Sequence, residues 1–369
     1  MSTNLAQKAT DLTLALIAID SPSKEEKAAR EDLIRRFQKL GLTTVVDARG
    51  NLIASLEATK DYQKEPVVLL CSHMDTVPNA VGPTVVIDKG IIGTDGLKAL
   101  GADDKAATAA ILVALEHLIE NNLPHGPIKV LCTVEEEPGL QGVKDLDYSL
   151  LGPIGRGYVL DAEGPIGGII VKAAAKSDVK ITFSGKAAHA GFAPQKGISA
   201  ISAAAKAITE MKLLQVDEQT TANVGLIKGG EATNIVSDWC EIDLEVRSYS
   251  QEKLKKQLAH LEICCIKAIG AIGGSYEFMT TDLFPGYTVD HSDANLLHVQ
   301  ALCEQEGLPW RHIETFGGSD TSYLRQEGVP VLTLTSGYIH PHSPKEHIEI
   351  QQLEALTRLT IALCAPLKG

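Results

Sequence analysis

Apolar and polar positions alternate in blocks along this chain, and the blocks predict strands that alternate with helices. Continuous apolar runs at 67–71, 128–134, 157–160 and 329–334 are typical of strands that are covered on both faces. Residues 106–119 are apolar nearly all round, which predicts a buried helix. Strands that alternate with helices indicate an open α/β domain with a mostly parallel sheet.

The N-terminal part of the chain predicts two helices and a hairpin. Residues 13–19 form a short apolar stretch beside acidic residues, as in an amphipathic helix. Ser23 with Glu26 three residues later is a capping-box pattern, so we expect the second helix to begin at Ser23 and to end at Gly41. Residues 43–56 alternate and break at Arg49-Gly50-Asn51, which predicts a β-hairpin.

The middle of the chain shows a different order of elements. Strand-like and helical patterns follow one another at 179–184, 198–211, 223–227, 241–247, 251–269 and 275–280. Their order, βαββαβ, is the ferredoxin-like arrangement. We therefore expect an inserted domain at 176–284, which divides the larger α/β domain into 1–175 and 285–369.

Composition narrows the classes of function. The 369 residues are 44% hydrophobic, enough for the cores of two domains, and the net charge is −13. An acidic chain without a Lys/Arg cluster argues against a nucleic-acid or anionic membrane partner. No apolar run approaches the ~18 residues of a membrane span. Seven cysteines without framework spacing predict free thiols and a cytoplasmic location.

Acidic and imidazole side chains follow the predicted buried strands directly. In open α/β sheets, sites form at the carboxyl ends of strands, so we expect these side chains to lie close together. Mixed imidazole and carboxylate ligands suit zinc, and also manganese or cobalt. The side chains at strand ends are His73, Glu136, Glu137, Asp161 and His342.

Taken singly, two of these motifs also have structural explanations. His73 and Asp75 face the same way in an extended chain, so Asp75 could orient a ligand His73, but a lone His-x-Asp is more often structural. Asp103 follows Gly101-Ala102 at a predicted helix start, where it suits an N-cap as well as a carboxylate that bridges two cations.

The glutamates at 135–137 and the C-terminal histidines leave further alternatives. Three adjacent carboxylates usually form a solvated loop, but their place directly after a buried strand favours a metal site. One glutamate would then bind metal while its neighbour accepts the proton of the attacking water. His340 and His347 compete with His342 for the ligand role.

Successive motifs resemble one known family over nearly the whole chain and in the same order. The chain is similar to the co-catalytic zinc family that contains peptidase T, carboxypeptidase G and the aminoacylases, and within it to peptidase T and shorter peptidase T-like proteins. The motifs are His73-Met74-Asp75-Thr76-Val77, Gly101-Ala102-Asp103-Asp104-Lys105-Ala106, Glu136-Glu137, Gly185-Lys186-Ala187-Ala188-His189-Ala190-Gly191, Gly229-Gly230-Glu231-Ala232-Thr233-Asn234-Ile235 and His342-Ser343-Pro344.

The resemblance implies a division of roles in the larger domain. Two zinc ions per chain would be bound, one by His73 and Asp161 and the other by Glu137 and His342, with Asp103 bridging them. Asp75 would be the catalytic aspartate beside His73. Glu136 would be the general base and acid that activates the water between the metals.

For the inserted domain, the resemblance implies a lid that also forms a homodimer. His189 would contact the substrate carbonyl or the oxyanion, often from the partner subunit. Asn234 and Arg247 match substrate-contacting positions less securely.

The expected activity is that of a dinuclear zinc exopeptidase on small peptides, a peptidase T-like tripeptide aminopeptidase. The chain is short for a full peptidase T, so tripeptide selectivity does not follow automatically. An N-acyl-amino-acid amidohydrolase or carboxypeptidase of the same family is one alternative. A non-catalytic zinc-binding scaffold is another, against which the presence of Asp75 and Glu136 argues.

Overall fold

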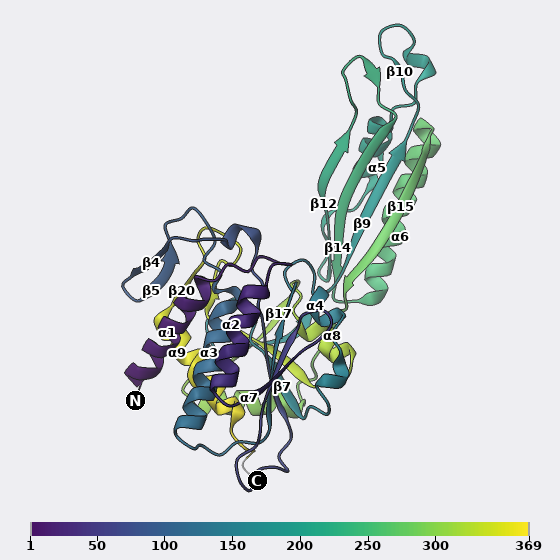
Figure 1. Cartoon of the computed structure of the whole chain (residues 1–369). Helices are drawn as coiled ribbons and strands as arrows, with labels where there is room; N and C mark the ends of the chain where they lie inside the picture. The colour runs from purple at the N-terminus through teal and green to yellow at the C-terminus, as the bar shows by residue number, and fades with distance from the viewer. Residues whose placement is uncertain (1, 368–369) are drawn as a thin grey trace. The chain divides into compact units, whose positions relative to one another are not determined.

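The computed structural model describes residues 2–367, and these form two compact units. The first unit runs to Val171, includes Thr288–Glu314 and resumes at Ser319, while the second comprises Lys172–Tyr287 and Thr315–Gly318. Figure 1 shows the helices and strands of both units. No helix in the described range is long and apolar enough to cross a membrane.

A nine-stranded sheet forms the centre of the first unit. Its order is β1-β2-β6-β3-β7-β18-β8-β16, and β17 pairs with β8. The central strands β6, β3, β7 and β18 run parallel, whereas β1, β2 and β8 pair antiparallel at the flanks. The bounds are β1 Thr43–Val46, β2 Leu52–Leu56, β3 Val68–His73, β6 Ile128–Thr133, β7 Arg156–Val159, β8 Gly168–Ala173, β16 Tyr287–Thr288, β17 Arg311–Thr315 and β18 Val331–Leu334.

Helices bury the middle of this sheet. All six residues of β3 are buried, which confirms the strand predicted from the run at 67–71. α3 packs on β3, α2 on β1 and β2, and α7 and α8 on β18, while α1, α3 and α9 pack on one another. The bounds are α1 Ser2–Ile17, α2 Lys27–Lys39, α3 Ala102–Glu120, α4 Gln141–Lys144, α7 Ala294–Gln305, α8 Thr321–Gln326 and α9 Ile350–Cys364.

A smaller sheet in the first unit was not predicted. It has the order β19-β20-β5-β4, and each pair in it is antiparallel. Its strands are only two to four residues long, so they leave no clear alternation in the sequence. The bounds are β4 Val85–Asp88, β5 Ile91–Thr94, β19 Tyr338–Ile339 and β20 His347–Glu349.

The second unit has the predicted ferredoxin-like order of elements, with one unpredicted strand, β11, added at the edge of its sheet. Its antiparallel sheet, β11-β12-β14-β9-β15, carries α5 and α6 on one face. Alternate residues of β9 and β14 are buried, because only one face of the sheet is covered. The bounds are β9 Ala175–Ser184, β10 Ala188–His189, α5 Ala200–Glu210, β11 Leu214–Asp217, β12 Thr220–Gly229, β13 Ile235–Val236, β14 Trp239–Ser248, α6 Gln251–Ile272 and β15 Ser275–Phe284.

Candidate metal centre

Parallel strands bring the predicted ligands to one edge of the large sheet. β6, β3 and β7 are neighbours in parallel register, so the residues after each strand emerge on the same side. His73 ends β3, the glutamates follow β6 and Asp161 follows β7. Asp103 lies at the start of α3, and His342 lies in the loop between β19 and β20.

The side chains form two groups that share Asp103. In the first group, His73 Nε2 lies 3.1 Å from Asp103 Oδ1 and 3.8 Å from Asp161 Oδ1. In the second, His342 Nε2 lies 3.2 Å from Asp103 Oδ2 and 2.9 Å from Glu137 Oε2. Within each group the possible ligand atoms all lie within 4.8 Å of one another. The two oxygens of Asp103 therefore face different groups, as a bridging carboxylate requires.

Hydrogen bonding fixes the orientation of the His73 ring. Nδ1 lies 2.9 Å from the backbone carbonyl oxygen of Asp75, which can only accept, so Nδ1 carries the proton and donates it. Nε2 is then the nitrogen that faces Asp103 and Asp161, and it would supply its lone pair to a bound metal. A neighbouring acceptor on Nδ1 holds the ring for this role, as in many metal sites.

The carboxylate of Asp75 holds the turn that carries the glutamates. Its Oδ1 accepts from the backbone N–H of Glu136 at 3.0 Å, and its Oδ2 accepts from that of Glu137 at 3.2 Å. Oδ1 lies 3.5 Å from His73 Nδ1, farther than the backbone carbonyl does. Asp75 therefore orients His73 mainly through its main chain and the glutamates through its side chain.

Ser23 also binds Asp75, and this corrects the predicted start of the second helix. Helix α2 begins at Lys27 rather than at Ser23. The Ser23 hydroxyl donates to Asp75 Oδ2 at 2.7 Å, and Glu26 accepts from the backbone N–H groups of Lys24 and Glu135. Tertiary contacts near the site therefore replace the local capping box.

Glu136 and Glu137 differ in their surroundings. Glu136 is buried, and burial, with the nearby charge of Asp161, raises the pKa of its carboxyl well above the ordinary value. Burial also raises the pKa of Glu137, although its hydrogen bond with His342 opposes that change. Glu137 Oε1 is buried without a hydrogen-bond partner. Glu136, whose carboxyl binds a proton tightly, thus lies next to Glu137, whose Oε1 has a free lone pair.

The charges around the two groups fit divalent cations. Burial raises the pKa of Asp161 well above its ordinary value. Burial lowers the pKa of His73, but hydrogen bonds with Asp103 and Asp75 raise it well above the ordinary value overall. Hydrogen bonds with Asp103 and Glu137 raise the pKa of His342 to about 10. The buried carboxylates thus attract positive charge, and imidazole with carboxylate is a donor set that zinc and its neighbours accept.

The two competing histidines lie outside both groups. The His340 ring packs against His347 with centroids 6.1 Å apart, and its Nδ1 lies 3.9 Å from Glu163. His347 Nδ1 bonds the backbone carbonyl of Lys345. Only His342 of the three joins Asp103 and Glu137, and it does so with a backbone φ of 61°, a strained value for a residue with a side chain.

The predicted substrate contacts belong to the second unit. His189 is exposed, and its Nδ1 accepts from the backbone N–H groups of Gly191 at 3.1 Å and Phe192 at 3.2 Å. Asn234 is also exposed. It lies near His189, because its backbone carbonyl accepts a hydrogen bond from the backbone N–H of Ala190.

Arg247 is engaged within the second unit. Its guanidinium forms two hydrogen bonds with Glu245, at 2.9 and 3.1 Å, and donates to the backbone carbonyl of Phe316. A substrate would have to compete with Glu245 for this side chain.

Three buried side chains around the groups were not predicted. Tyr338 donates to Asp161 Oδ1 at 3.0 Å, and Asp320 accepts from Thr133 at the end of β6 at 2.6 Å. The Glu346 carboxylate accepts hydrogen bonds from the backbone N–H groups of Leu100, Gly101 and Asp103. In the sequence, Glu346 could have been noticed only by its position. It lies four residues after His342 and directly before the alternating segment His347-Ile348-Glu349.

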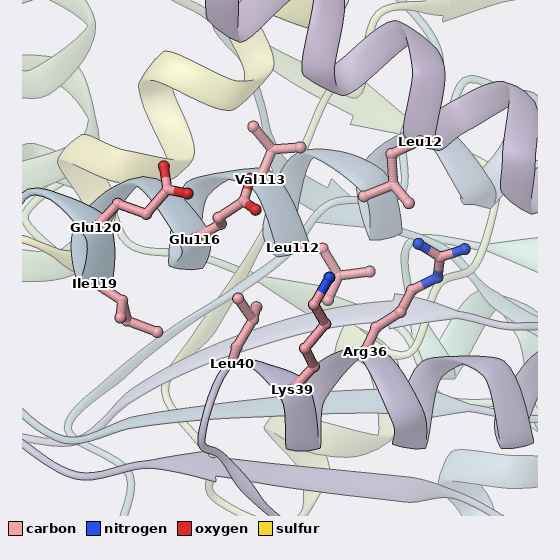
Figure 2. Close-up of a pocket in the computed structure, with 9 residues that line it drawn as sticks. All are labelled: Leu12, Arg36, Lys39, Leu40, Leu112, Val113, Glu116, Ile119 and Glu120. Atoms are coloured by element: carbon pink, nitrogen blue, oxygen red, sulfur yellow. The ribbon is translucent and has the colours of Figure 1, made fainter.

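A separate hollow on the first unit has different chemistry. It has a volume of about 440 Å³ and lies between α2, α3 and Leu12 of α1 (Figure 2). Arg36 and Lys39 stand on one side and Glu116 and Glu120 on the other, with leucine side chains between them. Its lining contains no histidine, cysteine or hydroxyl group, and both groups of possible metal ligands lie elsewhere in the first unit.

Comparison with known proteins identifies similar families and structures. A model of the peptidase dimerisation domain matches residues 176–268, and a model of peptidase family M28 matches residues 51–149. The chain is 37% identical to protein YqjE of Bacillus subtilis (strain 168) over 95% of each chain.

Two solved structures are similar over nearly their full length. The aminopeptidase PepT of Bacillus cereus is 35% identical, with a TM-score of 0.88 over 97% of this chain and 98% of that one. A tripeptidase of Staphylococcus aureus is 35% identical, with a TM-score of 0.93 over 97% of both chains.

Proposed function

The chain belongs to the peptidase T-like M20 family of metallopeptidases, and from this premise we propose that it is a dinuclear zinc aminopeptidase of small peptides, tripeptides above all. The observation that carries the proposal is the pair of ligand groups joined by Asp103, with the buried Glu136 beside them. The names of the PepT and tripeptidase relatives support the substrate class. Manganese or cobalt could replace zinc at such ligands.

His73, Asp103 and Asp161 would hold one ion, and Asp103, Glu137 and His342 the other. When bound, two such ions lower the pKa of a water molecule and polarise the scissile carbonyl. Glu136 would take the proton of the attacking water and return it to the leaving amine. A buried carboxylate with a raised pKa suits both transfers, because it holds the proton until the amine departs.

Asp75 would keep Glu136 in place, since its carboxylate binds the backbone N–H groups of Glu136 and Glu137. His189 would donate a hydrogen bond from Nε2 to the oxyanion. The second unit would serve as lid and homodimer contact, which the match to a peptidase dimerisation domain supports. With free buried thiols at all seven cysteines, a reducing cytoplasm is the proposed location.

A paired-substrate assay tests the substrate class. The zinc-loaded protein should release the N-terminal residue of a free-amine tripeptide such as Ala-Ala-Ala and should leave its N-acetylated form intact. Mass spectrometry of the products identifies the end that is cleaved. Release of the C-terminal residue, or preference for acetyl-alanine, would move the chain to the carboxypeptidase or N-acyl-amino-acid branch of the family. Binding of metal without hydrolysis of any of these would favour the scaffold.

A further inference from the structure

One distant carboxylate binds the backbone that carries Asp103. Glu346 Oε2 accepts hydrogen bonds from the N–H groups of Leu100 at 2.9 Å and Gly101 at 3.0 Å, and Oε1 accepts from that of Asp103 at 3.0 Å. The Glu346 side chain is 1% exposed, so water does not compete for these bonds. Hydrogen bonds to a charged acceptor are the stronger kind, and this carboxylate makes three.

The start of helix α3 needs such an acceptor. The first N–H groups of a helix have no partner inside it, and Gly101 at the N-cap offers no side chain to bind them. Asp103 itself departs from helical geometry, with φ −77° and ψ 106°. The local sequence therefore does not fix this backbone, and Glu346 supplies the missing acceptor from 243 positions away along the chain.

Glu346 also lies close along the chain to the other end of the ligand cluster. It ends the turn 343–346, which follows His342 directly and in which the Glu346 N–H donates to Ser343 O at 3.0 Å. Directly after it, β20 pairs with β5, which anchors the turn to the first unit. The contacts close a ring from Asp103 N–H to Glu346, along the turn to His342, and from His342 Nε2 back to Asp103 Oδ2.

We propose that Glu346 is a positioning residue that sets the spacing between the Asp103 carboxylate and the His342 imidazole. Through this spacing it would set the affinity of the second metal position, which is the one formed by Asp103, Glu137 and His342. This inference rests on the proposed function only in treating these two side chains as ligands. Glu346 touches neither substrate nor metal in this scheme. It acts through the main chain of one ligand and through the turn that carries the other.

The chemistry of the side chain allows a sharp substitution. Glu346→Gln preserves the shape, but the amide nitrogen would meet backbone N–H donors where the carboxylate presents an acceptor. At least one of the three bonds is then lost, and the segment at 100–103 loosens. Glu346→Asp keeps the charge with a shorter reach, so an intermediate effect is expected. Glu349→Gln is the matched control, because Glu349 is a nearby exposed glutamate at the end of β20.

The measurement is the affinity for Zn²⁺, taken by competition with a chromophoric chelator. Loss of a group that orients a ligand commonly costs about 10–100-fold in metal affinity. We expect Glu346→Gln to weaken the second Zn²⁺ by about that factor. We expect Glu349→Gln to match the wild type and Glu346→Asp to lie between them. At saturating Zn²⁺ the Glu346→Gln variant should show a lowered kcat with an almost unchanged KM.

Amide hydrogen exchange of the metal-free wild-type protein tests the same idea without any substitution. The N–H groups of Leu100, Gly101 and Asp103 should exchange slowly even without metal, because Glu346 binds them. Rapid exchange there in an otherwise folded protein would overturn the proposal, as would a folded Glu346→Gln variant with wild-type affinity for both ions. A lowered Tm with unchanged Zn²⁺ affinity would assign Glu346 a structural role only. Weakened Zn²⁺ binding in a protein that cleaves no peptide would refute the proposed function and leave this inference standing.

Discussion

At the scale of single residues, hydrogen bonds to the main chain decide what each histidine can do. The Nδ1 of His73 donates to a backbone carbonyl, which leaves Nε2 as the nitrogen that would bind a cation. The Nδ1 of His189 accepts from two backbone N–H groups, which places the proton of the neutral ring on Nε2. The same side chain is therefore prepared to bind a cation in one case and an anionic oxygen in the other.

The assignment of the general base gives a prediction for Glu136. Glu136→Gln keeps the size of the side chain but removes its capacity to accept a proton. Turnover of a tripeptide should fall by at least ~10²-fold, the usual scale for loss of a general base. Zinc content, measured by elemental analysis, should stay at the wild-type level.

Glu137→Gln is the paired control, since Glu137 lies 2.9 Å from His342 in the second ligand group. It should lose metal as well as activity. If Glu136→Gln remained active while Glu137→Gln kept both metals and lost only activity, the two roles would have to be exchanged.

At the scale of elements, short loops after rigid strands carry the chemistry. The turn after β6 is held by Asp75 and also by Asn51, whose side chain accepts from Val134 N at 3.1 Å and donates to Gly142 O at 2.9 Å. Gly142 is required there, because a Cβ would lie 2.0 Å from the carbonyl oxygen of Val134. The loop after β10 in the second unit is built differently, around the His189 ring itself, which Phe192 stacks upon at 4.3 Å.

The loop at His189 gives a prediction for the lid. His189→Ala removes the Nε2 donor, and loss of one oxyanion donor typically lowers kcat by about 10²–10³-fold. Zinc occupancy should be unchanged, because the ligand groups contain no residue of the second unit. Phe192→Ala is the control for disturbance of the loop, since it removes the stacked ring but keeps the imidazole. Equal losses of kcat in the two variants would indicate a role in loop structure instead of donation to the oxyanion.

At the scale of the whole molecule, an acidic chain concentrates buried carboxylates at one edge of its sheet. Asp103, Asp104, Glu136 and Asp161 are all largely buried there, and burial raises the pKa of Asp104, Glu136 and Asp161. Cations that bind the folded chain offset this repulsion, so metal and folding stability should be linked.

Removal of metal should therefore destabilise the protein. A ligand present at about a thousand times its Kd stabilises the folded state by about 4 kcal/mol. For a chain of this size, loss of that stabilisation after chelation corresponds to a Tm lowered by about 5 °C. Calorimetry with and without chelator measures the shift, and added zinc should reverse it. Asp103→Asn should show a much smaller shift, and an equal shift in that variant would contradict the bridging role.

Mixed dimers test whether subunits share a site. If His189 acts on the partner subunit, a hybrid of Glu136→Gln and His189→Ala subunits regains one complete site, and some activity should return from two inactive proteins. Native mass spectrometry verifies the hybrid. Absence of recovery in a verified hybrid would confine His189 to its own chain.

The sequence by itself determined the two-part α/β architecture and the candidate ligands. Buried parallel strands are continuous apolar runs, and a functional side chain directly after such a run is confined to the sheet edge. His73, Glu136, Glu137 and Asp161 could be named for this reason. The ferredoxin-like order of the inserted segment could also be predicted. Strands that are covered on one face alternate apolar and polar residues, and a long helix such as α6 gives a clear helical pattern.

Only the tertiary structure decided how these side chains are held. The bonds from Ser23 to Asp75, from Tyr338 to Asp161 and from Glu346 to the backbone at Asp103 join residues far apart along the chain. A local pattern cannot encode such partners, and at Ser23 it predicted a helix cap instead. The choice of His342 over His340 and His347 has the same cause. Three histidines in one short segment look alike in sequence, and the turn that Glu346 anchors brings only His342 to Asp103.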